Sequence, residues 1–214
     1  MRESISDHER VTSDRGPLLA VLDAAVGALR RADVAFLTIG GVASAIWGRD
    51  RGTTDIDVFV RPESIEAALD ALEAEGFETS MEFEHWLYKA RRDGITVDVI
   101  YRASRDILID DEMMRRSSVG TFHGRPLPIA PPEDLVLMKA GAAGEDTARY
   151  WYDALGIVAR SDLDWDYLVA RARQHGARRV LSLLLFAASV DLVVPSEPVE
   201  QLWSVVHEGG RLGA

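Results

Sequence analysis

Residues 38–60 read TIGGVASAIWGRDRGTTDIDVFV, and this stretch decides the fold. One apolar run ends at Gly40-Gly41, and fourteen residues after Gly41 a second apolar run begins with two aspartates around an isoleucine. In a strand, residues i and i+2 point to the same face, so Asp55 and Asp57 would project together. Two adjacent carboxylates repel each other unless a cation lies between them or one of them binds a proton.

Composition is that of a globular protein: 214 residues, 47% hydrophobic and 28% charged, with a formal net charge of −11. The chain has no cysteine, which excludes disulfides and thiolate zinc sites. Its first residues do not resemble a secretory signal, and the longest apolar stretch, 180–194, is too short for a membrane span and contains Asp191. We therefore expect a cytoplasmic protein with no membrane contact. The acidic total argues against broad, non-specific nucleic-acid binding but permits a local basic patch.

The hydrophobic pattern changes at Pro131-Pro132, where a mixed α/β half gives way to an all-helical half. We expect a flexible tail at 1–15, an α+β domain at 16–130 and a C-terminal helical domain at 131–214. The elements expected before the two prolines are helices at 17–31, 42–48, 63–76 and 105–117, strands at 34–39, 55–60 and 119–130, and a hairpin turning at Asp93-Gly94. Those expected after them are helices at 132–143, 145–160, 162–174 and 177–190.

A third carboxylate lies in the apolar run ITVDVIY, where Asp98 would be costly to bury unless it were paired or bound to a metal. Acids of this kind can also simply face water from an edge strand. Three of them following a Gly-Gly turn favour a metal site of the kind that phosphoryl-transfer enzymes use. The glycines fit this reading, because glycine permits positive φ and lets the backbone approach a ligand closely.

This arrangement resembles the nucleotidyltransferase superfamily related to DNA polymerase β, and in particular toxins of the AbiEii and MenT groups. Their pattern GG-x-A…R-x-T-x-DID is matched by Gly40, Gly41, Ala43, Arg51, Thr53, Asp55 and Asp57. The resemblance implies a mixed sheet with flanking helices, followed by a helical bundle. It also implies that the two glycines grip a nucleoside triphosphate, that Asp55 and Asp57 hold two Mg²⁺ (or Mn²⁺) ions, and that Asp98 helps to hold metal or to activate the attacking hydroxyl.

The C-terminal half carries a second part of the resemblance, a lysine followed by a K-D-x-x-D-L element. Lys139 matches the lysine and Asp153 the second aspartate, whereas Tyr150 replaces the first aspartate and Arg149 the lysine before it. The resemblance implies catalytic roles for Lys139 and Asp153, with Lys139 placed to neutralise triphosphate charge. Loop residues that could reach the nucleotide are Arg49, Arg51 and Thr53. The other lysine, Lys89, has no family counterpart, and we expect its replacement to matter little.

The acceptor of the nucleotide is less defined. The toxin resemblance implies transfer of a nucleoside monophosphate to the 3′ end of tRNA, and a cognate antitoxin as protein partner. Two alternatives remain open: an aminoglycoside or lincosamide as acceptor, and a non-catalytic member of the fold. Arginines that could form a patch for RNA are Arg171, Arg173, Arg178 and Arg179, although a solvated helix face is the commoner outcome for such a run.

Overall fold

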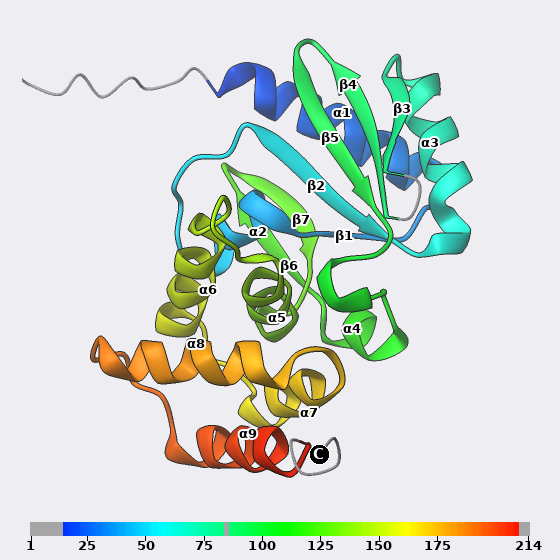
Figure 1. The fold of residues 1–214 in the computed structure, drawn as a ribbon. Helices are drawn as coiled ribbons and strands as arrows, with labels where there is room; N and C mark the ends of the chain where they lie inside the picture. Colours follow the sequence, from blue (N-terminus) through cyan, green and yellow to red (C-terminus); the bar gives the residue numbers. More distant parts are fainter. Residues whose placement is uncertain (1–14, 84–85, 210–214) are drawn as a thin grey trace, which may run out of the picture.

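The computed structural model describes residues 15–83 and 86–209 (Figure 1). The tail expected at 1–15 therefore lies outside the described residues, except for Arg15. The strands form one sheet in the order β3-β4-β5-β2-β1-β7-β6. Their bounds are β1 Phe36–Thr38, β2 Asp55–Val60, β3 Glu78–Phe83, β4 Leu87–Arg92, β5 Ile95–Ile100, β6 Ser118–Phe122 and β7 Arg125–Ile129. The pairs β2–β5 and β1–β7 are parallel and the others antiparallel, so the mixed sheet and the α+β class are confirmed.

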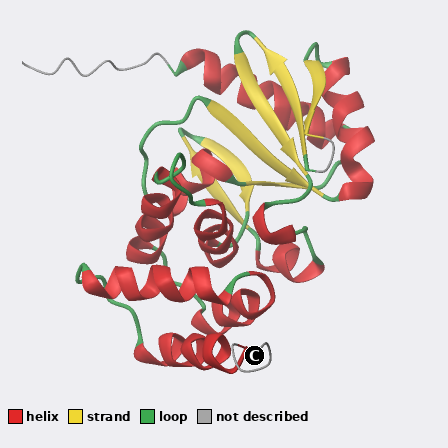
Figure 2. Cartoon of the chain, viewed as in Figure 1, coloured by secondary structure: helices red, strands yellow, loops and turns green. Residues whose placement is uncertain are grey.

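Helices flank both faces of this sheet (Figure 2). Their bounds are α1 Gly16–Arg31, α2 Gly40–Trp47, α3 Ile65–Ala74, α4 Asp111–Arg116, α5 Pro132–Ala142, α6 Arg149–Arg160, α7 Trp165–His175, α8 Ala177–Ser189 and α9 Ser196–Gly209, with single turns of 3₁₀ helix at Pro62–Ser64 and Ser104–Asp106. None of the helices in the described part of the chain is long and apolar enough to cross a membrane.

Two hydrophobic clusters fix these layers. On one face, apolar residues of α1 and α3 pack against alternate residues of β2 and β5, such as Ile56 and Val97. On the other face, Phe59 and Ile100 belong to a cluster that includes α5 and the helices after it. Helix α5 is buried over almost its whole length, because the sheet lies on one side of it and the other helices on the opposite side. The helical segment is therefore packed directly onto the sheet.

The strands that carry the acids lie side by side in the sheet. β2 is hydrogen-bonded to β5 in parallel register, and Asp57 stands opposite Asp98. Along β2 the side chains alternate as expected for a strand, with Ile56 and Val58 fully buried and both aspartates partly exposed on the other face. The topology thus places Asp98 next to Asp57, although Asp98 comes 41 positions later in the sequence.

Two expected elements were wrong in detail. The helix predicted at 105–117 is helical only from Asp111, because Ile107 and Ile109 point into the core from an extended segment and Asp110 caps the helix by accepting a hydrogen bond from Met113 N (2.8 Å). The strand predicted at 119–130 is a hairpin of β6 and β7, whose two turn residues, 123 and 124, both have positive φ.

Candidate active site

The turn between β1 and α2 lies against the acidic strand. Gly40 has φ +62°, and a Cβ added there would overlap Asp57 Oδ2, so both the backbone angle and the space require glycine. A Cβ added at Gly41 would overlap Thr53 Oγ1. The Gly41 amide is 3.4 Å from Asp57 Oδ2, to which it donates a hydrogen bond. The two glycines therefore allow the first turn of α2 to pack against Asp57 and Thr53.

The carboxylates of β2 and β5 occupy different environments. Thr53 Oγ1 donates a hydrogen bond to Asp55 Oδ1 (2.8 Å) and so orients that carboxylate. Burial, reinforced by the negative charge of Asp55, raises the pKa of Asp57 to about 6, although Lys139 opposes the shift. Burial also raises the pKa of Asp98, and there Lys89 opposes it. One Asp98 oxygen is buried without a hydrogen-bond partner.

Lys89 is a member of the site that the sequence analysis missed. Its Nζ lies 3.7 Å from Asp98 Oδ1 across the β4–β5 hairpin, where the two residues stand directly opposite each other. The signal was present in the sequence, because a two-residue turn at Asp93-Gly94 places Lys89 and Asp98 at equal distances from the turn. The contact with Asp98 gives a physical reason to expect that replacing Lys89 does affect the site, contrary to the expectation from the sequence that its replacement matters little.

A buried carboxylate anchors two cations on the opposite wall of the site. Asp153 is fully buried in α6 and accepts hydrogen bonds from Arg51 Nε (3.0 Å) and from Lys139 Nζ (3.2 Å). The carboxylate therefore does not line the cleft itself but holds the Arg51 and Lys139 side chains, which do. Lys139 is 6% exposed, so little of it beyond the charged end can reach a ligand.

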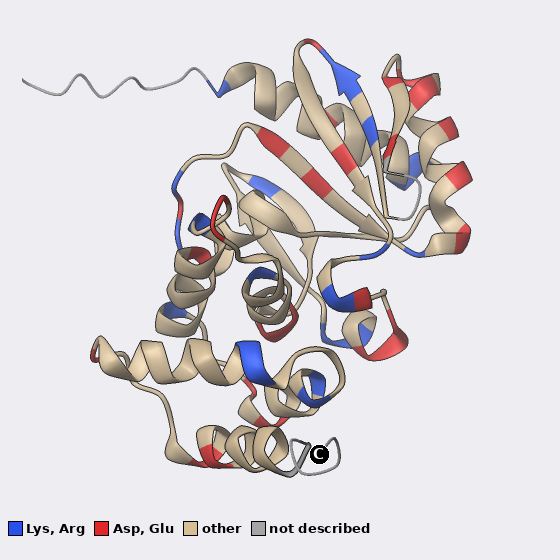
Figure 3. Cartoon of the chain, in the orientation of Figure 1, with Lys and Arg blue, Asp and Glu red and all other residues tan. Residues whose placement is uncertain are grey.

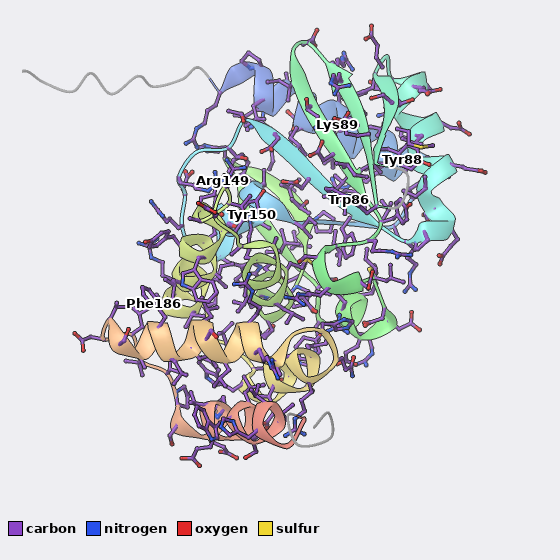
Figure 4. The ribbon with its side chains drawn as sticks, viewed as in Figure 1. Trp86, Tyr88, Lys89, Arg149, Tyr150 and Phe186 are labelled. Carbon is purple, nitrogen blue, oxygen red and sulfur yellow. The ribbon has the colours of Figure 1, made fainter. Side chains whose placement is uncertain are left out.

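The ring of Tyr150 is in contact with two cations. Lys139 Nζ is 4.6 Å and Arg149 Cζ 5.2 Å from the centre of its ring. Figure 4 shows Arg149 and Tyr150 on the α6 side of the acidic strand and Trp86 and Lys89 on the β4 side. Arg49, by contrast, is exposed, packs beside Gly156 of α6 and is not among the residues that line the cleft.

These groups surround a cleft of about 860 Å³ between the sheet and the helical segment. Its lining includes the two glycines, the aspartates of β2 and β5 and the cations Arg51, Lys139 and Arg149. The segment after β5 adds Arg102, Arg105 and Asp106, of which Arg102 and Asp106 form an ion pair (3.3 Å). Figure 3 shows the acidic bands of β2 and β5 on these two strands of the sheet. The cleft thus has one acidic wall and one basic wall, which suits a ligand that carries both metal and phosphate.

A divalent metal fits the acidic wall at the Asp55–Asp57 pair. No three acidic, histidine or cysteine side chains among residues 15–83 and 86–209 are grouped closely enough to form a metal site by themselves. Mg²⁺, however, is commonly held by only one or two carboxylates together with substrate phosphates. Both carboxylates offer the hard oxygen ligands that this ion needs, and a cation bound between them would offset both the burial and the Asp55 charge that raise the pKa of Asp57.

The chain matches one protein family over most of its length. A family described as uncharacterised nucleotidyltransferases matches residues 18–190. No curated protein matches the chain significantly. Among solved structures, the antibiotic-resistance factor ANT(2'')-Ia is similar at 14% identity with a TM-score of 0.49, over 92% of this chain and 95% of its own.

The same factor in complex with adenylyl-2''-tobramycin matches at 15% identity with a TM-score of 0.46, over 89% of this chain and 98% of its own. The lincosamide antibiotic adenylyltransferase LnuA, with lincomycin bound, matches at 14% identity with a TM-score of 0.48, over 66% and 96%. Because the family match covers most of the sequence, this chain belongs to the nucleotidyltransferase family and is a nucleotidyltransferase.

Proposed function

We propose that this protein transfers a nucleoside monophosphate from an NTP to the 3′ hydroxyl of an RNA, specifically tRNA, and acts as the toxin of a toxin–antitoxin pair. The observation that carries the chemistry is the cleft in which Asp55 and Asp57 face Lys139 and Arg149. The RNA acceptor, the toxin role and the cognate antitoxin rest on the motif resemblance to the AbiEii and MenT groups. The NTP would lie between the segments 16–130 and 131–214, because both contribute to the lining.

Each residue has a distinct task in this proposal. The Gly40-Gly41 turn and Thr53 accommodate the phosphates by close approach of backbone and small polar groups. Lys139 and Arg51, held by Asp153, bind the triphosphate oxygens and offset the charge that develops on the leaving pyrophosphate. When Asp55 and Asp57 bind Mg²⁺ or Mn²⁺, the ion adds further neutralisation of phosphate charge.

Asp98 is the group that would take the proton of the attacking hydroxyl. It lies next to Asp57 in the sheet, and its raised pKa brings its basicity closer to the working pH than that of an exposed aspartate. Lys89, opposite Asp98, keeps that carboxylate ionised and in place. Asp98 and Lys89 therefore lie on the acceptor side of the cleft, and Lys139 and Arg149 on the nucleotide side.

The experiment incubates the protein with each radiolabelled NTP, Mg²⁺ and total tRNA, and separates the RNA by electrophoresis. We expect label in tRNA with at least one NTP, and none with Asp55→Asn. Expression should slow bacterial growth, and the same substitution should relieve it. Harmless expression combined with raised resistance to an aminoglycoside or a lincosamide, and no labelled RNA, would show that the acceptor is a drug.

A further inference from the structure

A second hollow of about 320 Å³ adjoins the cleft. Its lining consists of Arg105, Gly176, Ala177, Arg178, Arg179, Val205 and Val206. Arg105 also lines the cleft, so the two spaces meet at this side chain. Among the described residues that form it, three are arginines and none is acidic. This is a concentration of positive charge on a chain whose formal net charge is −11.

Arg105 is held in position by contacts on both sides. Ser104 Oγ donates a hydrogen bond to the Met138 carbonyl of α5 (2.8 Å), and His175 Nδ1 of α7 lies 3.2 Å from the Arg105 carbonyl oxygen. Gly141 lets this turn approach α5, since an added Cβ there would lie 3.1 Å from Arg105 Cγ. Arg105 has φ +64°, a left-handed conformation that is costly for a residue with a Cβ. The protein thus places a long cation where glycine would be the less strained choice.

The other two arginines come from the start of α8. Arg178 is exposed, and neither it nor Arg105 has an ion-pair partner within the part of the chain that the structure describes. The Arg179 guanidinium donates a hydrogen bond to the Ala143 carbonyl (2.8 Å), which fixes the charged end of this side chain at the end of α5. Figure 3 shows basic residues both at the start of α8 and in the segment between β5 and α4.

Arg171, which the sequence groups with Arg178 and Arg179 as a possible RNA-binding patch, does not line this hollow. It is 6% exposed and forms ion pairs with Asp134 (2.8 Å) and Asp110 (2.5 Å), so it ties α7 to α5 and to the start of α4. The grouping of Arg171 with Arg178 and Arg179 in one exposed patch was therefore wrong. Arg105, 73 residues earlier than Arg178 in the sequence, takes its place in the hollow.

We propose that this hollow is the path of the acceptor RNA, an inference that rests on the function proposed above. The 3′ end enters the cleft beside Asp98, one backbone phosphate binds Arg105, and the next lies between Arg178 and Arg179. Val205 and Val206 provide an apolar wall against which a sugar or a base packs. A cationic drug would be repelled by the same lining, because the described residues place three arginines and no carboxylate around it.

The test measures RNA binding by fluorescence anisotropy as a function of KCl concentration. The probe is a single-stranded RNA with the 3′-terminal sequence of tRNA, labelled at its 5′ end, and every protein carries Asp55→Asn to prevent turnover. For single-stranded RNA, each phosphate contact contributes about −0.7 to the slope of log K against log salt. We expect Arg105→Ala and the double variant Arg178→Ala/Arg179→Ala each to reduce the magnitude of the slope by about 0.7.

The matched control is Arg30→Ala/Arg31→Ala at the end of α1. It also removes two adjacent arginines at a helix end, one of which donates to a backbone carbonyl (Arg30 to Pro126, 3.0 Å), and it changes the net charge equally. We expect its slope to equal that of the parent. Thermal melting by circular dichroism checks folding. If the α8 double variant does not fold, the single variant Arg178→Ala, at an exposed residue, replaces it, and we expect it also to reduce the magnitude of the salt slope.

The outcomes separate this inference from the proposed function. If tRNA is labelled in the transfer assay but the α8 and Arg105 variants keep the parental slope, the RNA path is wrong and the proposed function stands. An equal loss in the α1 control shows a general charge effect and also overturns the path. Competition by AMP or inorganic phosphate as strong as by RNA would identify a small-anion site instead. If the wild type does not label tRNA and the Asp55→Asn parent does not bind the RNA probe, the proposed acceptor fails as well.

Discussion

Asp57→Asn should make the metal-free protein more stable while it abolishes transfer. The pKa of Asp57 is raised from 3.8 to about 6, mainly by burial and then by Asp55. The folded state therefore binds the Asp57 proton more tightly than the unfolded state does. At one pKa unit per 1.36 kcal/mol, ionised Asp57 destabilises the folded protein by about 3 kcal/mol at neutral pH, and asparagine removes that penalty.

Because the pKa of Asp57 is raised in the folded state, the destabilisation by ionised Asp57 depends on pH in a defined range. Below pH 3.8 Asp57 is protonated in both states and carries no penalty. As the pH rises to about 6 the penalty grows, and above that value it is complete. The difference in unfolding free energy between Asp57→Asn and the wild type should therefore increase over this window and then remain constant. Urea unfolding in EDTA at several pH values measures it.

A control variant isolates the site from general charge effects. Asp70→Asn removes one carboxylate from the exposed side of α3, and we expect it to leave the pH dependence of the wild type unchanged. Excess Mg²⁺ with a non-hydrolysable NTP analogue should stabilise the wild type more than Asp57→Asn, because only the wild type retains both carboxylates. A difference between Asp57→Asn and wild type that is flat from pH 4 to pH 7 would refute the reasoning.

Three further substitutions test other parts of the site. Gly40→Ala puts alanine at a left-handed φ, which costs about 1 kcal/mol, and makes its Cβ overlap Asp57 Oδ2. The rate of transfer should therefore fall strongly, whereas the melting temperature should fall only slightly. Lys139→Ala leaves Asp153 buried with Arg51 as its one cation, so the free energy of unfolding in urea should fall by about 3 kcal/mol and the KM for NTP should rise. If Lys139→Gln left the KM for NTP unchanged, the proposed contact between Lys139 and phosphate would be wrong. Lys89→Met removes the cation that lowers the pKa of Asp98, so the acid limb of the pH–rate profile should move to higher pH, and Lys89→Arg should restore it.

The DID strand, the Gly-Gly turn and the hairpin at Asp93-Gly94 were predictable because each has a local signal. Alternation places Asp55 and Asp57 on one face, and the turn at Asp93-Gly94 sets the register that pairs β4 with β5. The segment 105–117 was mispredicted because its hydrophobic residues fit a helical period as well as a strand-like one. Only packing against the core, where Ile107 is fully buried, keeps its first half extended.

The partners of the charged residues depend on contacts that no local pattern reports. Asp153 follows Arg51 by 102 positions, and their pairing exists only because α6 packs against the loop before β2. The same is true of Arg171, whose spacing predicted an exposed helix face and whose position is decided by Asp134 and Asp110. A charged residue in an apolar stretch of sequence indicates that it needs a partner of opposite charge, whereas the fold decides which residue that partner is.

The charges of the cleft are only partly balanced among the described residues, and from this we expect a preference for a ligand that carries both signs of charge. On the acidic wall, burial and the charge of Asp55 raise the pKa of Asp57, and Asp98 Oδ1 has no hydrogen bond beyond its 3.7 Å ion pair with Lys89. On the basic wall, Arg149 stacks on Tyr150 and has no ion pair within the described residues. A bare nucleotide would satisfy only the basic wall, and a bare metal ion only the acidic one. A metal-bound triphosphate satisfies both at once, so binding of the two should be cooperative, as their linked free energies require. Calorimetric titration of the NTP should therefore show tighter binding with Mg²⁺ than without it, and Asp55→Asn should abolish that difference while Lys139→Ala weakens binding in both conditions.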